Sequence, residues 1–72
     1  MPPLRVLSGR KVRKILEANG FVFDRQNGSH MILVMRTDDD SKTVSVPDHK
    51  ELSIGTLGGI IRESGLSRAL FE

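Results

Sequence analysis

The sequence contains no cysteine, so disulfide bonds cannot stabilise the fold, and a reducing compartment suits the chain. No apolar run approaches the roughly 18 residues of a membrane-spanning helix, and no signal-peptide pattern opens the sequence. We therefore expect a cytoplasmic protein. We expect residues 1–72 to form one domain with a thin core, because a domain of this size buries only about 60% of its unfolded surface.

Several kinds of catalytic and binding site are also missing. The chain has no cysteine and only two histidines. This small number of ligands excludes a typical structural zinc site. The acidic run Asp38–Asp40 lacks the glycine and the distal glutamate of a calcium loop, and there is no P-loop for a nucleotide. A Ser-His-Asp hydrolase of this size would lack room for a substrate pocket. The sequence predicts a protein that needs no metal and no cofactor.

Positive charge is concentrated near the N-terminus. The net charge is only +2, and the first acidic residue, Glu17, comes after a run of bases: Arg5, Arg10, Lys11, Arg13 and Lys14. This distribution suggests an anionic partner for one face of the molecule. Charge alone does not distinguish such a partner from an ordinary basic helix face exposed to solvent.

Capping and turn residues divide the chain into a helix, three strands and a second helix. Ser8 is a suitable N-cap, and Asn19-Gly20 can end the helix so that Phe21 folds back onto Leu16 in a Schellman ending. The expected elements are a helix over 9–19, strands over 21–25, 29–36 and 42–46, a helix between Ser53 and Gly65, and a short C-terminal turn after Ser67.

The second strand, which follows the hairpin signal Asn27-Gly28, is apolar on both faces. One face carries His30, Ile32, Val34 and Arg36, and the other carries Met31, Leu33 and Met35. The alternation therefore does not indicate which face meets the core. Two helices on one face of this sheet make a two-layer α+β domain, α-β-β-β-α, whose open face should carry an apolar strip. Leu70 and Phe71 should cover the edge of the core.

One chemistry suits a small, basic domain without metal ligands: RNA cleavage by the 2′-hydroxyl of the RNA itself. The protein must only move a proton near neutral pH and hold a phosphate. An unperturbed histidine, with a pKa of about 6.5, suits the first task. Arginine and lysine side chains and the N–H groups of a turn suit the second. His30 is the candidate, although an isolated histidine can simply complete a hairpin, and His49 in its loop can be equally ordinary.

Four segments stand in this order between about residues 8 and 71: "SGRKVRKILEANGF", "RQNGSH", "TVSVPDH" and "LSIGTLGGIIRESGLS". In these segments the chain resembles the HicA toxins of toxin–antitoxin systems. The resemblance implies the double-stranded-RNA-binding-domain fold. It also implies a ribosome-independent endoribonuclease that cleaves mRNA and is neutralised by a HicB antitoxin.

The resemblance also implies site residues. The catalytic histidine of the family lies in a Gly-Ser-His motif, which falls here on Gly28, Ser29 and His30, so His30 is expected to be catalytic. Asn27 stands where family members often carry a base, so one phosphate contact is expected either to be missing or to be supplied by Arg25. The residues expected to bind single-stranded RNA are Arg10, Lys11, Arg13, Lys14, Arg25, Gly28 and Ser29.

The sequence is also compatible with two other functions. A module that grips double-stranded RNA without cutting it would carry a lysine cluster at the start of its second helix, whereas this segment reads "SIGTLGGI". A protein-interaction domain would use the apolar open face of the sheet.

Overall fold

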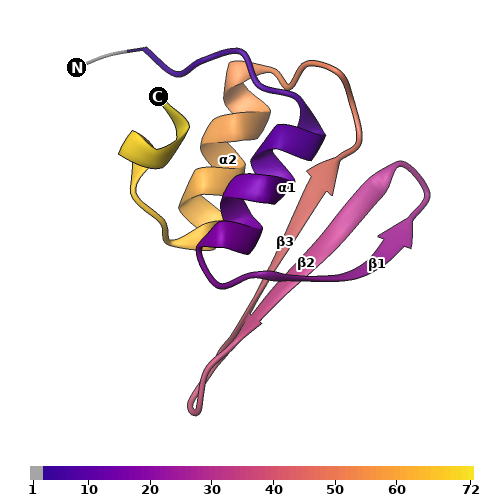
Figure 1. Cartoon of the computed structure of the whole chain (residues 1–72), viewed down its shortest axis with the longest axis vertical. Helices are drawn as coiled ribbons and strands as arrows, with labels where there is room; N and C mark the ends of the chain where they lie inside the picture. The colour runs from indigo at the N-terminus through magenta and orange to yellow at the C-terminus, as the bar shows by residue number, and fades with distance from the viewer. Residues whose placement is uncertain (1–2) are drawn as a thin grey trace.

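The computed structural model describes residues 3–72 as a sheet of three antiparallel strands, in the order β1-β2-β3, with two α-helices packed on one face (Figure 1). The elements are α1 (Gly9–Ala18), β1 (Val22–Asn27), β2 (His30–Arg36), β3 (Ser41–Pro47), α2 (Ile54–Ser64) and the short 3₁₀ helix η1 (Arg68–Phe71). The predicted α+β class and element order are confirmed. Within this range, neither α-helix is long and apolar enough to cross a bilayer.

Helix α1 begins and ends as its sequence predicts. The Ser8 hydroxyl accepts a hydrogen bond from the Lys11 N–H at 3.1 Å, which satisfies a donor that the first turn leaves without a partner. At the other end the Phe21 N–H donates to the Leu16 carbonyl at 3.0 Å, and both side chains are buried in the core. This is the six-residue hydrogen bond of a Schellman motif, which turns the chain directly into β1.

The β1-β2 hairpin closes one residue later than the Asn27-Gly28 signal suggests. Asn27 pairs with His30, so the loop consists of Gly28 and Ser29. Gly28 has a φ of +62° and Ser29 has no positive φ, as in a type II′ turn, where glycine takes the first loop position. The predicted strand boundaries at Arg25 and Ser29 were therefore wrong. Strand β1 runs on to Asn27, and β2 begins at His30, the first residue after the turn.

A β-bulge at Asp24 changes the faces of the second half of β1. Phe23 pairs with Leu33, but the next pair is Arg25 with Ile32, so Asp24 is the extra residue. Strict alternation would place Arg25 on the helix side with Phe23. The bulge places it instead on the open face of the sheet, the face of Ile32 and His30.

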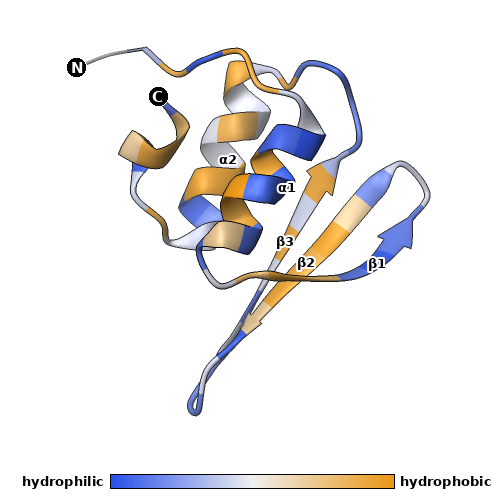
Figure 2. Cartoon of the chain, in the orientation of Figure 1, coloured by the Kyte–Doolittle hydropathy of each residue, from blue (hydrophilic) through white to orange (hydrophobic). Residues whose placement is uncertain are grey.

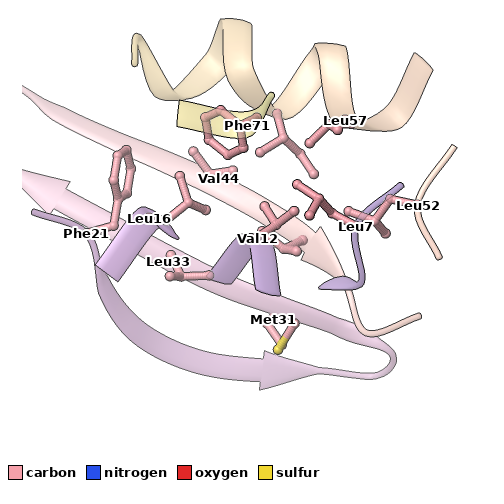
Figure 3. Packing of buried hydrophobic residues seen from close by; sticks show 12 residues of the cluster. Leu7, Val12, Leu16, Phe21, Met31, Leu33, Val44, Leu52, Leu57 and Phe71 are labelled. Carbon is pink, nitrogen blue, oxygen red and sulfur yellow. The ribbon is translucent and has the colours of Figure 1, made fainter. Parts of the chain in front are cut away.

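The core lies between the helices and the face of β2 that carries Met31 and Leu33, which are 2% and 0% exposed (Figure 3). Ile32, on the opposite face, is buried to 7% exposure but does not belong to this core. With the half-buried Val34 and the exposed Val22, it forms the expected apolar strip on the open face. The strong hydropathy of β2 along most of its length is visible in Figure 2.

The C-terminal 3₁₀ helix closes the core with one side chain. Phe71 is 0% exposed, and its carbonyl accepts a hydrogen bond from the Arg5 N–H at 3.4 Å. Leu70 is 41% exposed, so the prediction that it also covers the core was wrong. The reason is geometric, because successive side chains of a 3₁₀ helix project about a third of a turn apart.

Candidate functional site

His30 lies at the end of the sheet, on its open face. It is exposed, it is the first residue of β2, and it pairs with Pro47 at the end of β3. Its Nδ1 atom lies 3.0 Å from the Oγ atom of Ser45, and within residues 3–72 the ring has no other hydrogen-bond partner. The imidazole is therefore accessible to a macromolecule and is also held at one of its two nitrogens.

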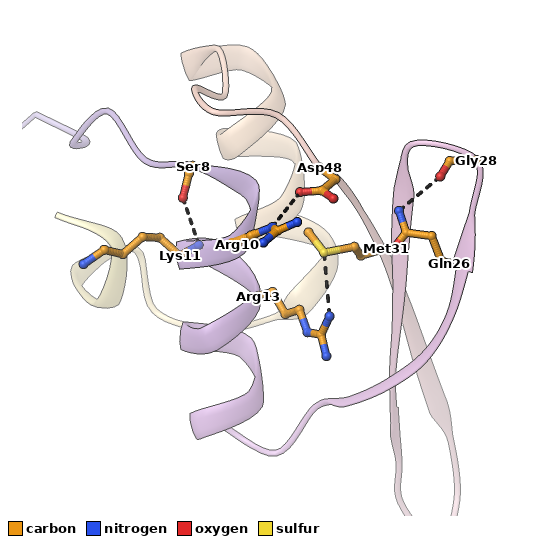
Figure 4. A network of polar contacts seen from close by, with 8 residues as sticks. All are labelled: Ser8, Arg10, Lys11, Arg13, Gln26, Gly28, Met31 and Asp48. Atoms are coloured by element: carbon orange, nitrogen blue, oxygen red, sulfur yellow. Dashed lines mark hydrogen bonds and ion pairs between the residues drawn. The ribbon is translucent and has the colours of Figure 1, made fainter.

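Three of the predicted RNA-binding residues gather on the other side of the sheet. They line an open cavity of about 410 Å³, whose walls are Arg10, Arg13, Lys14, Glu17, Gln26, Met31 and Asp48. Figure 4 shows Arg10, Arg13, Gln26, Met31 and Asp48 of this set. Met31 is the chain neighbour of His30 but points to the helix side. This basic pocket and the imidazole thus lie at the same end of the sheet on opposite faces.

The arginines of the basic pocket are not equivalent. The Arg13 guanidinium lies 4.0 Å from the centroid of the Phe23 ring, and its Nε atom lies 3.5 Å from a Glu17 carboxylate oxygen. These contacts orient the Arg13 side chain along α1 and over Phe23 of β1. The Arg10 side chain is 80% exposed and has an ion pair of 3.2 Å with Asp48. An exposed pair of this kind contributes about 1 kcal/mol or less, so a phosphate can compete for it.

The other basic residues lie outside this pocket. Lys11 is exposed but does not line the cavity, and Figure 4 shows it pointing away from Arg13 across α1. Arg25 is brought to the face of His30 by the bulge, where its Nη1 atom lies 2.5 Å from Oδ2 of Asp24. The predicted RNA-binding side chains are therefore divided among three surfaces.

Backbone hydrogen bonds join the loop after β3 to the hairpin turn on one side and to the start of α1 on the other. The Ser29 carbonyl accepts a hydrogen bond from the Asp48 N–H at 2.7 Å, and the His49 carbonyl accepts one from the Gly9 N–H at 2.8 Å. A Cβ atom on Gly9 would lie 1.9 Å from the Pro47 carbonyl oxygen, so only glycine fits there. This junction fixes the position of Gly28 and Ser29 beside His30.

Three polar residues of this region were missed by sequence reasoning. Ser45 contacts His30, and Asp48 pairs with Arg10. Gln26 lines the basic pocket and donates to the Gly28 carbonyl at 3.1 Å. A serine in an alternating strand and polar residues beside turns are unremarkable in sequence. The contact of Ser45 spans a strand pairing, that of Asp48 joins a loop to α1, and that of Gln26 lies within the hairpin. Among residues 3–72, no three His, Cys, Asp or Glu side chains are grouped so that they could hold a metal ion.

The fold and these surfaces define a small α+β domain with an exposed histidine at the end of its sheet and a basic pocket beside it. The family model described as "HicA toxin of bacterial toxin-antitoxin" matches residues 9–66 of the 72, and the chain belongs to this family. It is therefore the toxin component of a toxin–antitoxin system, which implies an antitoxin partner. A search of curated proteins gave no match.

Proposed function

We propose that this toxin is an endoribonuclease that cleaves single-stranded mRNA without a metal, with His30 as general acid or base. The observation that carries the proposal is the His30 ring, exposed at the first residue of β2 and held at Nδ1 by Ser45. A proton-transfer residue needs both accessibility and a defined orientation. Since mRNA is the substrate, the proposal also places the toxin in the cytoplasm.

The reaction needs little from the protein. His30 removes the proton of an RNA 2′-hydroxyl, and the 2′-oxygen attacks the adjacent phosphorus. The bond from phosphorus to the 5′-oxygen breaks, and that oxygen takes up a proton. The products are a 2′,3′-cyclic phosphate and a 5′-hydroxyl. Because RNA lies along a surface, no enclosed substrate pocket is required.

The division of the basic residues suggests how RNA is held. Arg25 shares the open face with His30 and is placed to contact a phosphate near the scissile bond. Arg10 and Lys14 line the basic pocket on the opposite face, so they contact phosphates further along the strand. The backbone at Gly28 and Ser29 lies between these two surfaces at the hairpin turn. The RNA therefore passes around the end of the hairpin.

The antitoxin partner implied by the family is proposed to be a HicB-type protein that covers His30 and the apolar strip. Val22 is 68% exposed and Val34 is half-buried, so these two residues of the strip are open to a partner, whereas Ile32 is only 7% exposed. Its burial contributes about 25 cal/mol for each Å² of apolar area before the costs of association are subtracted. Covering His30 at the same time excludes RNA.

Cleavage is expected to continue in the presence of EDTA, because the proposed proton transfer and phosphate contacts use only groups of the protein itself. The measurement is cleavage of a single-stranded RNA oligonucleotide with and without the chelator, followed by analysis of both new ends. A 2′,3′-cyclic phosphate and a 5′-hydroxyl are expected. Loss of activity in EDTA with recovery on adding magnesium contradicts the mechanism, and binding without any product identifies a non-catalytic RNA-binding module.

Neutralising Arg10 and Lys14 together is expected to weaken RNA binding without regard to base sequence. Each phosphate contact that is lost should reduce the slope of log K against log salt by about 0.7 for a single strand. The measurement is the affinity of Arg10→Gln/Lys14→Gln for one oligonucleotide over a range of salt concentrations. The matched control is Arg62→Gln, an exposed base on α2, which should leave the slope unchanged. Equal slopes for the double variant and the wild type would show that RNA does not bind at Arg10 and Lys14.

A further inference from the structure

The hydroxyl of Ser45 is the hydrogen-bond partner of the His30 ring, and the pairing of β2 with β3 explains why they meet. His30 pairs with Pro47 and Ile32 pairs with Ser45, so the two side chains are diagonal neighbours on the open face. Nδ1 of His30 and Oγ of Ser45 lie 3.0 Å apart. Both residues are exposed, so this contact contributes little to packing.

Ser45 is held in place from the other side of the sheet. Its chain neighbours Val44 and Val46 are both 0% exposed and belong to the core beneath the helices. They anchor the backbone of β3 on each side of Ser45, and its side chain points away from them to the open face. The anchored backbone fixes the Cβ atom of Ser45, and the rotamer that the side chain adopts brings Oγ to 3.0 Å from Nδ1 of His30.

We propose that Ser45 is a positioning residue, whose Oγ accepts a hydrogen bond from Nδ1–H of His30 and so directs Nε2 toward the RNA. The inference rests on the proposed catalytic role of His30, to which it adds a tautomer and a partner. The hydrogen bond made at one ring nitrogen determines which nitrogen carries the proton in the neutral ring. With Nδ1 protonated, the lone pair is on Nε2.

Both forms of a catalytic imidazole are compatible with this arrangement, and neither is compatible with the reverse, in which the serine hydroxyl donates to Nδ1. A general base needs a lone pair on Nε2, and a general acid is the imidazolium, which has a proton on each nitrogen. Ser45 accepts from Nδ1–H in both forms. If the serine hydroxyl instead donated to Nδ1, the neutral ring would carry its proton on Nε2 and could not accept the proton of a 2′-hydroxyl there.

The tautomer is measured without any reaction, by the ¹⁵N chemical shifts of the ring nitrogens in the full-length protein at a pH where the ring is neutral. The variant His49→Gln leaves His30 as the only imidazole and assigns its signals, since the chain has two histidines. We expect Nδ1 to be protonated in the wild type and Ser45→Ala to move the population toward the Nε2-protonated form. A neutral ring protonated at Nε2 in the wild type, or the same tautomer in both proteins, overturns the proposal.

Kinetics supply the second readout. Loss of one neutral hydrogen bond of ordinary net strength corresponds to a decrease in the rate constant of up to about tenfold. Ser45→Ala is expected to lower kcat by this factor with KM little changed, because Ser45 acts on the ring rather than on the RNA. Ser45→Thr keeps the hydroxyl and is expected to restore both kcat and the tautomer. Thr43→Ala is the matched control, because Thr43 lies on the same face of β3 but pairs with Val34, away from His30.

The failure of this inference differs from the failure of the proposed function. If His30→Ala cleaves RNA as fast as the wild type, His30 is not catalytic, whatever the tautomer. If His30→Ala is inactive while Ser45→Ala keeps the wild-type tautomer and kcat, His30 is catalytic and Ser45 does not position it. A loss of kcat in Thr43→Ala equal to that in Ser45→Ala shows a general weakening of β3, which also overturns the role of Ser45.

Discussion

Replacing His30 with alanine is expected to lower the rate of RNA cleavage at least about 100-fold, the usual contribution of a general acid or base. The protein should remain folded, because His30 is exposed at the end of β2 and lies outside the core. The measurements are the cleavage rate of an RNA oligonucleotide, growth arrest on expression in cells, and a thermal unfolding curve of each protein. An active variant refutes the assignment of His30, and an inactive but unfolded one would require the kinetics to be repeated with a milder substitution such as His30→Gln.

The matched control is His49→Ala, which removes the other histidine of the chain. Its side chain is exposed in the loop after β3, and the contact that this residue makes with Gly9 uses its backbone carbonyl. The substitution keeps that carbonyl, so cleavage, toxicity and stability should all stay close to those of the wild type. A loss as large as that in His30→Ala would extend the catalytic site to the loop and would contradict a role for His30 alone.

Replacing Phe71 with alanine is expected to destabilise the domain by about 3–5 kcal/mol, the usual cost of removing a buried phenylalanine. Phe71 is 0% exposed although it is the second residue from the C-terminus. A domain of this length has a total stability of only about 4–10 kcal/mol, so the substitution should remove between about a third and all of it. Urea denaturation followed by circular dichroism measures the loss.

Leu70→Ala is the control for this prediction, since the two residues are neighbours in the same 3₁₀ helix. Leu70 is 41% exposed, so its truncation removes less buried area and leaves no cavity in the core. We expect a cost of about 1 kcal/mol or less. Equal losses for the two variants would show that η1 is not docked through Phe71, and the C-terminal residues would then be dispensable for the core.

The sequence by itself determined the local structure and indicated the family. Ser8, the Asn19-Gly20 pair and Gly28 act through their own backbone and their near neighbours, so caps, helix ends and the hairpin could be predicted within about a residue. The Gly-Ser-His motif and the four matching segments indicated the HicA family, which the family model confirms. The role of His30 that this resemblance implies stays a prediction.

The tertiary structure alone decided how the side chains are grouped. Strand β2 is apolar on both faces, and only helix packing chose Met31 and Leu33 for the core and left Ile32 opposite. The bulge at Asp24 moved Arg25 to the face of His30, and pairing of β2 with β3 brought Ser45 to the imidazole. These outcomes depend on strand register and on contacts between residues far apart in the chain. A local sequence pattern does not encode them, because the same pattern is compatible with either register and either face.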